Sequence, residues 1–361
     1  MASNQSQNEP RQTIFDADFH LTEELDQIVP YLQEPYNELF ERDGGEGYRR
    51  THPNPGFFTP SRMGKQRGLS ITTKEDVVAA KEELGLEYVL VQPSLNLYLG
   101  CTYHEEVSTA LAAAYNNWIA DEILDVDEGI YGSILVSPQL PSNAATEIKN
   151  RSKRSEFVSV LIPSGGVHPT LGNKMYNPIY ETSERLGLPI TLHNAAGTMM
   201  HAFPLLFQDY TRTLTTHATL HPMQHMAHLS DMIVQGIPVR YPDIQIVIQE
   251  SGLGWIPFMM RRLDSEYLNY RSDAPMLEQM PSDYIRDNFY FTTQPLEGYK
   301  QPEYIKNVME SMGIGNIMFS TDYPHFDFDH TNELLDRLGH LDEGDKEQIA
   351  GLTAIELFDI K

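Results

Sequence analysis

Short apolar segments alternate along this chain with longer stretches in which apolar residues recur at helical spacing. The short segments are rich in β-branched or aromatic residues and run into polar ones, which is typical of strands buried in a parallel sheet. Because strands that alternate with helices indicate βαβ units, we expect one mainly parallel sheet. The pattern predicts eight strands, at Thr13–Asp18, Tyr88–Gln92, Gly129–Val136, Phe157–Ile162, Pro189–His193, Ile244–Glu250, Phe289–Thr293 and Asn316–Thr321.

The stretches between these segments have the features of helices. Two of them end in glycine turns, at Gly187 and Gly313, and glycine is preferred just beyond the C-terminus of a helix. The expected helices are Lys74–Leu84, Glu105–Leu124, Asn143–Arg151, Pro178–Leu186, Pro222–Gln235, Trp255–Asn269, Glu303–Met312 and Lys346–Leu357.

Eight strands alternating with helices in 361 residues fit an α/β fold of the (β/α)8 TIM barrel type. The surplus length falls in two insertions, Leu21–Thr73 after the first strand and Ala195–His221 after the fifth. We expect residues 1–12 to form a disordered tail and residues 13–361 to form a single barrel domain. A doubly wound sheet is the competing architecture, but its dinucleotide-binding form needs a G-x-G-x-x-G motif after the first strand, and this chain lacks one there.

The composition narrows the range of partners and metal sites. The chain has 26 Lys and Arg residues against 51 Asp and Glu residues, a formal net charge of −25, so we expect neither nucleic acid nor a membrane as partner. It shows no leader sequence and no run of about 18 apolar residues, which favours a cytoplasmic location. Because Cys101 is the single cysteine, any metal must be bound by histidines and carboxylates.

Potential metal ligands follow several of the predicted strands. Alternate side chains of a strand share a face, so Asp16, Asp18 and His20 are expected to point together toward the barrel axis. His193 ends the fifth strand, Glu250 ends the sixth, and Asp322 and His325 follow the eighth. Since the C-terminal ends of barrel strands carry the active site, these side chains are expected to converge.

The motifs at these positions form a specific set. They are DADFH at the first strand, LHNAAG at the fifth, IVIQESGLGWIPFMMRRLDSEY around the sixth, FYFTTQP at the seventh and FSTDYPHFD at the eighth. With them the chain resembles the amidohydrolase superfamily, and within it the amidohydrolase-2 group that includes aminocarboxymuconate semialdehyde decarboxylase-like and resorcylate decarboxylase-like enzymes. The resemblance covers roughly Ile14 to Phe358.

This resemblance implies one divalent metal ion held by Asp18, His20, His193 and Asp322. The chain departs from the group at Asp18, where histidine or glutamate is usual. The ion expected is Zn²⁺ or Mn²⁺, and the oxygen-rich donor set favours Mn²⁺ somewhat.

Glu250 replaces the histidine that the decarboxylases of the group carry on the sixth strand. Its carboxyl group can act as an acid or base, serve as a further metal ligand, or cap the helix that begins near Trp255. We expect the acid or base role, because the four other residues already supply enough ligands for one ion.

A run of histidines follows the fifth strand. His217, His221 and His225 are spaced i,i+4, which suggests a second metal site, but Pro222 is expected to begin a helix and to leave His217 and His221 in the preceding loop. We therefore expect His221 to face substrate as a catalytic residue. The candidate substrate contacts are His325, Arg62, Tyr103 and Arg212.

The resemblance favours a metal-dependent lyase, most simply a non-oxidative decarboxylase or other C–C-cleaving enzyme acting on an aromatic or unsaturated carboxylic acid. A metal-dependent hydrolase is the alternative within the same superfamily. In it Asp322 or Glu250 acts as the catalytic base that takes a proton from metal-bound water, and the hydroxide attacks a carbonyl group. A catalytically inactive barrel that only binds ligands is the third hypothesis. The partner expected is a small-molecule carboxylic acid, and the resemblance also implies a homodimer.

Overall fold

The computed structural model of the protein describes residues 12–42, 69–102, 104–195, 198, 213–298 and 300–361. Eight parallel strands follow one another in the order of the chain and form one sheet. The predicted strands are confirmed, with small differences at their ends. They are β1 (Phe15–Leu21), β2 (Tyr88–Pro93), β3 (Ile130–Leu135), β4 (Phe157–Pro163), β5 (Ile190–His193), β6 (Ile246–Ile248), β7 (Phe289–Thr292) and β8 (Ile317–Met318).

The sheet curves round so that its two edge strands meet. The backbone nitrogen of Ala17 donates to the carbonyl oxygen of Phe319 at 2.9 Å, and the nitrogen of Asp322 donates to the carbonyl oxygen of Asp18 at 3.1 Å. The fold is therefore the expected (β/α)8 barrel. These bonds also bring the end of β1 directly beside the segment after β8.

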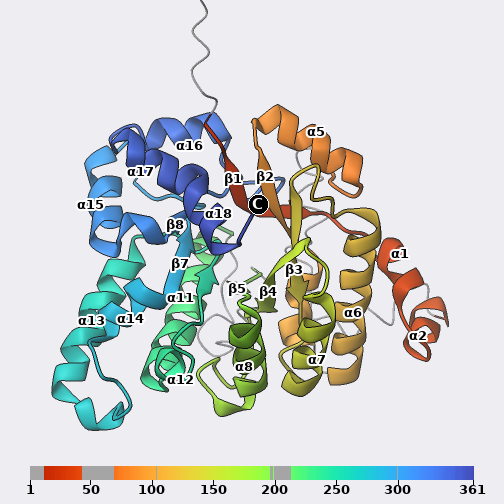
Figure 1. Ribbon diagram of the computed structural model, residues 1–361, viewed down its shortest axis with the longest axis horizontal. Coiled ribbons are helices and arrows are strands. Elements are labelled where there is room, and N and C mark those ends of the chain that lie inside the picture. Colours follow the sequence, from red (N-terminus) through yellow and green to blue (C-terminus); the bar gives the residue numbers. More distant parts are fainter. Residues whose placement is uncertain (1–11, 43–68, 103, 196–197, 199–212, 299) are drawn as a thin grey trace, which may run out of the picture.

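Helices surround the strands as an outer layer (Figure 1). Those of the first half of the chain are α1 (Leu25–Ile28), α2 (Tyr36–Arg42), α5 (Lys74–Leu84), α6 (Glu105–Glu122), α7 (Pro141–Arg151) and α8 (Asn177–Leu186). Those of the second half are α11 (Thr213–Val234), α12 (Ile237–Arg240), α13 (Trp255–Asn269), α14 (Pro281–Asn288), α15 (Pro302–Met312), α16 (Thr331–Arg337), α17 (Glu343–Glu347) and α18 (Thr353–Leu357).

The core has two parts, one on each side of the strands. A large cluster, to which Phe19 and Leu21 belong, fills the space between the strands and the helices. A smaller cluster combines Phe15 and Ala17 with residues of five other strands, so it lies inside the barrel, where Phe358 beyond α18 covers it. The apolar side chains of β1 thus change sides between Ala17 and Phe19, at the point where its pairing with β2 shifts register.

Two predicted helices differ from the structure. The helix expected at Pro222–Gln235 begins at Thr213, so Pro222 lies inside it and His217 and His221 are helical rather than in a loop. The helix expected at Lys346–Leu357 is divided, because a π-helical turn at Gln348–Leu352 separates α17 from α18. The first difference puts His217 and His221 on one helix, where residues one turn apart share a face.

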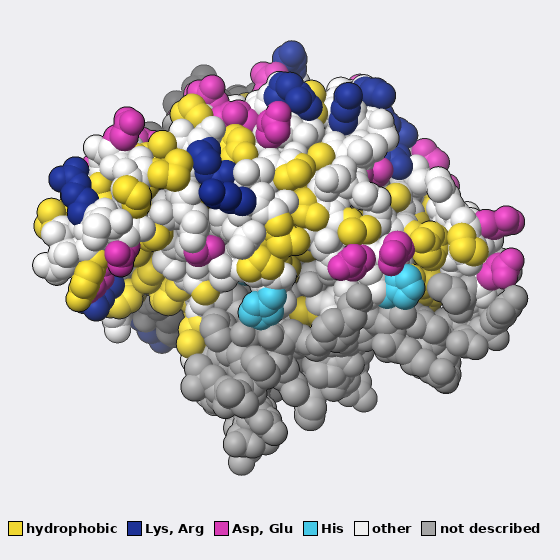
Figure 2. Space-filling model, turned by 90° about the horizontal axis from the view of Figure 1, so that it is seen from below, with side chains coloured by type: hydrophobic (Ala, Val, Ile, Leu, Met, Phe, Trp, Pro, Cys, Tyr) yellow, Lys and Arg dark blue, Asp and Glu magenta, His cyan; other side chains and the backbone are white. Residues whose placement is uncertain are grey.

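The described surface carries side chains of both charges (Figure 2). On the face in Figure 2, acidic, basic and hydrophobic side chains are interspersed over the described residues. No helix in the described ranges is long and apolar enough to cross a membrane.

His228 attaches α11 to the barrel. Its Nδ1 accepts a hydrogen bond from the nitrogen of Leu171 at 3.2 Å, so its Nε2 carries the proton and donates to the carbonyl oxygen of Ser164 at 2.9 Å. Burial lowers the pKa of the imidazole from 6.5 to about 4. The folded protein therefore uses the neutral form of this side chain.

We predict that this residue makes the fold acid-sensitive. Between about pH 6.5 and pH 4 the unfolded chain binds a proton at His228 that the folded chain does not, so the free energy of unfolding falls with pH by up to about 3 kcal/mol. The variant His228→Gln should be less stable at pH 7 but should lose correspondingly less stability on acidification. Urea unfolding of both proteins at several pH values measures this, and parallel pH profiles would contradict it.

Candidate metal centre

The end of β1 contributes two side chains to the interior of the barrel mouth. Asp18 and His20 are fully buried, and the register shift in β1 places them there while Asp16 lies elsewhere. The prediction that Asp16 shares their face is wrong. Its carboxylate instead accepts hydrogen bonds from the nitrogen of Thr321 at 3.1 Å and from the Thr321 hydroxyl at 2.5 Å. Asp16 therefore ties β1 to the segment after β8.

Four buried side chains converge beside the hydrogen bonds between Asp16 and Thr321. His20 Nε2 lies 3.3 Å from Asp18 Oδ1 and 3.2 Å from Asp322 Oδ1. His193 Nε2, at the end of β5, lies 3.3 Å from Asp18 Oδ1. Asp18, His20, His193 and Asp322 are each fully buried, so these contacts are closed to solvent. The structure thus brings together the four predicted metal ligands.

The hydrogen bonds of the two imidazoles decide which nitrogen faces the cluster. Nδ1 of His20 donates to the carbonyl oxygen of Pro93 at 3.0 Å, and Nδ1 of His193 donates to that of Asn194 at 2.8 Å. In a neutral imidazole this leaves a lone pair on each Nε2, directed at carboxylate oxygens. Metal-binding histidines commonly carry such a bond on the nitrogen that does not bind the metal.

The distances fit coordination better than hydrogen bonding. A charge-assisted hydrogen bond between an imidazolium and a carboxylate spans about 2.7–2.9 Å, whereas two ligands of one ion at about 2.1 Å lie roughly 3.0–3.4 Å apart. Nε2 of both histidines, both carboxylate oxygens of Asp18 and Oδ2 of Asp322 are buried without a hydrogen-bond partner. A cation among the atoms of Asp18, His20 and His193, which lie within 4.8 Å of one another, would satisfy those three side chains.

The pKa values of the two carboxyl groups shift in opposite directions. Burial raises the pKa of Asp18, but His193 and His20 lower it further, so that the net value lies below its ordinary range. Burial and the neighbouring carboxylates Asp327 and Asp18 hold the pKa of Asp322 well above its ordinary range. Without a cation the cluster therefore favours one ionised carboxylate over two.

The backbone is strained at two of these positions. Glu250 has a φ of 45° and Asp322 a φ of 60°, in the left-handed region that residues other than glycine rarely adopt. Such conformations cost on the order of 1–3 kcal/mol and gather at functional sites. Here they turn both carboxylates into the barrel mouth.

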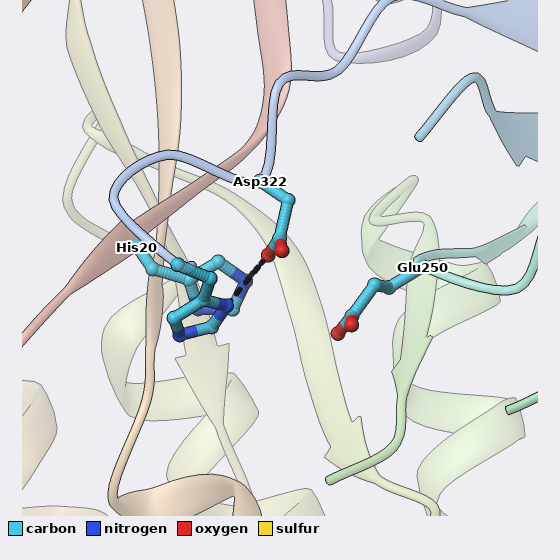
Figure 3. Close-up of side chains that lie close together, drawn as sticks. His20, Glu250 and Asp322 are labelled. Carbon is cyan, nitrogen blue, oxygen red and sulfur yellow. Dashed lines mark hydrogen bonds and ion pairs between the residues drawn. The ribbon is translucent and has the colours of Figure 1, made fainter. Parts of the chain in front are cut away.

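Glu250 reaches from the end of β6 toward Asp322 and His20 (Figure 3). Its Oε2 lies 3.5 Å from His193 Nε2, while its Oε1 lies 3.6 Å from His221 Nε2 and 3.9 Å from His217 Nε2. The helix cap that sequence allowed as an alternative belongs to another residue, because Glu297 accepts from the nitrogens of Leu253 and Gly254 before α13. Glu250 is a residue of the site.

His325 holds Asp322 from the other side. Its Nδ1 lies 2.7 Å from Asp322 Oδ1, and its Nε2 lies 2.9 Å from the hydroxyl of Ser94, which follows β2. Because neutral imidazole has one N–H, Nδ1 donates to the carboxylate and Nε2 accepts from the hydroxyl. His325 was predicted to contact substrate, and its side chain contacts Asp322, Ser94 and the ring of His20, whose centroid lies 4.1 Å from its own.

The other predicted site residues either lie outside the described residues or line the site. Arg62, Tyr103 and Arg212, and nearly all of the tail 1–12, lie outside the described residues. His221 is buried at the site, and both its ring nitrogens lack a hydrogen-bond partner. The sequence analysis passed over Asp327 and placed His217 in a loop, although its i,i+4 spacing from His221 was the signal that both share a helix face.

The family model described as Amidohydrolase matches residues 91–360. The chain belongs to the amidohydrolase family. The match begins inside β2 and covers β3 to β8 completely, so it includes His193, Glu250 and Asp322 but begins after Asp18 and His20. The family resemblance inferred from the strand-end motifs is thereby confirmed.

Individual relatives add two comparisons. The amidohydrolase is 23% identical over 314 residues to a gamma-resorcylate decarboxylase of Polaromonas sp. (strain JS666 / ATCC BAA-500), a match that covers 84% of this chain and 92% of the relative. Among solved structures it is similar to the 5-carboxyvanillate decarboxylase of Sphingomonas paucimobilis, with a TM-score of 0.72 and 22% identity over 97% of this chain and all of that one.

A third comparison concerns a structure with a metal. The dihydroxybenzoic acid decarboxylase of Polaromonas sp. JS666, solved with bound manganese and the inhibitor 2-nitroresorcinol, has a TM-score of 0.66 and 17% identity, covering 96% of this chain and 97% of that one. At such identities the two structures establish the shared barrel.

We predict that divalent ions stabilise the amidohydrolase. An ion that binds only the folded state adds about 2.7 kcal/mol when its concentration is a hundred times its dissociation constant, so EDTA should lower the midpoint of thermal unfolding. The variant His20→Ala should lose most of this sensitivity, whereas His340→Ala, at an exposed histidine, should keep it. Equal midpoints of the parent protein with and without EDTA would contradict the prediction.

Proposed function

We propose that this amidohydrolase is a metal-dependent, non-oxidative decarboxylase of an aromatic carboxylic acid. The observation that carries the proposal is the convergence of buried histidine nitrogens and carboxylate oxygens that have no partner other than one another. The similarity to resorcylate, carboxyvanillate and dihydroxybenzoate decarboxylases supports the reaction class.

Asp18, His20, His193 and Asp322 would hold one divalent ion. Two neutral imidazoles and two carboxylates suit Mn²⁺ and Zn²⁺, and the manganese in a structurally similar decarboxylase favours Mn²⁺. When bound, such an ion supplies positive charge against which a substrate carboxylate and a neighbouring hydroxyl group are oriented. The homodimer and the cytoplasmic location stay predictions.

Decarboxylation replaces the carboxyl group by a proton, so the chain must deliver a proton to a ring carbon. We assign this step to Asp322. Its Oδ1 contacts His20 and His325, whereas its Oδ2 is buried without a partner and is the position that can carry the transferable proton. His325, itself held by Ser94, fixes the orientation of the carboxyl plane.

The reaction class can be tested directly. Incubation of the metal-replete protein with 2,6-dihydroxybenzoate and with 5-carboxyvanillate should release carbon dioxide from at least one acid, and in heavy water the product should carry deuterium at the vacated carbon. His193→Ala should lower both bound metal and turnover, and His340→Ala should change neither. No release of carbon dioxide from either acid would contradict the decarboxylase assignment, and full metal occupancy in His193→Ala would remove this residue from the ligands.

Asp322→Asn separates proton transfer from metal binding. The amide keeps an oxygen toward His20 but cannot deliver a proton, so we predict that most of the metal remains while turnover falls roughly 10²–10⁴-fold, the usual effect of a positioned acid or base. Elemental analysis and product formation measure the two quantities on the same sample. Turnover above about half of the parent value would refute the assignment.

A further inference from the structure

A second group of ligand-type side chains lies beside the four residues assigned above. His217 and His221 are spaced i,i+4 on α11 and meet Glu250 from the end of β6. His217 Nε2 also lies 3.4 Å from Oδ2 of Asp327, in the loop after β8. Two separate elements thus direct two imidazoles and one carboxylate toward one point, and Asp327 contacts this group through His217.

The distances in this group resemble those in the first cluster. The imidazole nitrogens lie 3.4, 3.6 and 3.9 Å from carboxylate oxygens, beyond the reach of good hydrogen bonds. Tetrahedral ligands of zinc, at about 2.0–2.1 Å from the ion, lie roughly 3.4 Å apart. Two histidines one helical turn apart, joined by carboxylates from elsewhere in the fold, are a familiar zinc-binding arrangement.

An independent observation concerns His221. Its side chain is 5% exposed, yet neither of its ring nitrogens has a hydrogen-bond partner. Oδ1 of Asp327 is likewise buried without a partner. Because an unsatisfied buried polar group costs on the order of 1–3 kcal/mol, these atoms indicate a ligand that is bound there in use. His217 and Asp327, exposed by 19% and 24%, leave a way in from solvent.

The charge balance of the barrel mouth points the same way. Asp18, Asp322, Glu250 and Asp327 are four carboxylates, and within the described ranges their ion pairs are all with histidines. Carboxylates gathered this closely repel one another unless cations or protons separate them.

We propose that His217, His221 and Glu250 form a second divalent-cation site, of the chemical class that takes Zn²⁺, with Asp327 beside His217. Glu250 contacts ligands of both proposed sites, because its Oε1 faces the α11 histidines while its Oε2 faces His193. Its carboxylate would be shared if both ions were bound. The site requires only His217, His221 and Glu250 and does not depend on the reaction assigned above.

Metal stoichiometry tests the proposal without an activity assay. Protein stripped with a chelator and returned to chelator-free buffer is dialysed against graded Zn²⁺, and bound zinc is measured by elemental analysis. The parent protein should bind two equivalents, and His217→Ala and Glu250→Gln should each bind one, with affinity for the second ion reduced more than about tenfold. The matched control His340→Ala should bind two. Circular dichroism of the metal-free proteins checks that each variant is folded.

Each other outcome has a distinct meaning. One equivalent in the parent protein would overturn the second site and leave the first intact, whereas none would overturn the proposed function as well. Two equivalents retained in His217→Ala and in Glu250→Gln would show that the ligands are wrong. If Glu250→Gln kept two equivalents and lost turnover, Glu250 would be an acid or base, and the shared-ligand assignment would fail.

Discussion

The structure depends most on the burial of several carboxyl groups at one end of the barrel. Asp18 and Asp322 share a fully buried space with two imidazoles, and Glu250 is 6% exposed beside them. Carboxylates withdrawn from water beside one another repel one another strongly. Cations relieve this repulsion, and the fold holds the donor atoms apart at the separations that cations require.

The barrel supplies the rigidity for this arrangement through polar ties between elements that are distant in sequence. Asp16 binds both the backbone and the hydroxyl of Thr321, so the strand that carries Asp18 and the segment that carries Asp322 move together. Glu23 accepts from the nitrogens of Ser94 and Asn96 and thereby fixes the loop from which Ser94 reaches His325. Buried polar groups that are satisfied in this way specify a single geometry for the ligands.

The sequence was sufficient for the fold, which follows from periodic patterns, and for the converging ligands, which the family resemblance implied. Strand and helix alternation determined the barrel, and the position of His193 or Asp322 at a strand end determined its place at the mouth. The register shift in β1 could not be anticipated, because strict alternation would put Asp16 and Asp18 on one face and only the pairing of β1 with its neighbours reveals the change. The partners of His325 lay beyond sequence reasoning for the same reason, since Ser94 is 231 residues away.

The start of α11 shows how a local rule is overruled by packing. Proline inside a helix removes one hydrogen bond and costs about 3 kcal/mol, which is why Pro222 was expected at a helix start. The turns on both sides of Pro222 bury apolar side chains, with Leu220 before it and Leu229 after it fully excluded from solvent. Burying one such side chain contributes about 1.5–3 kcal/mol, so two offset the defect. The helix therefore continues through Pro222, and His217 and His221 lie one turn apart on the face that meets Glu250. These two histidines, which were expected in a loop, line the site from α11.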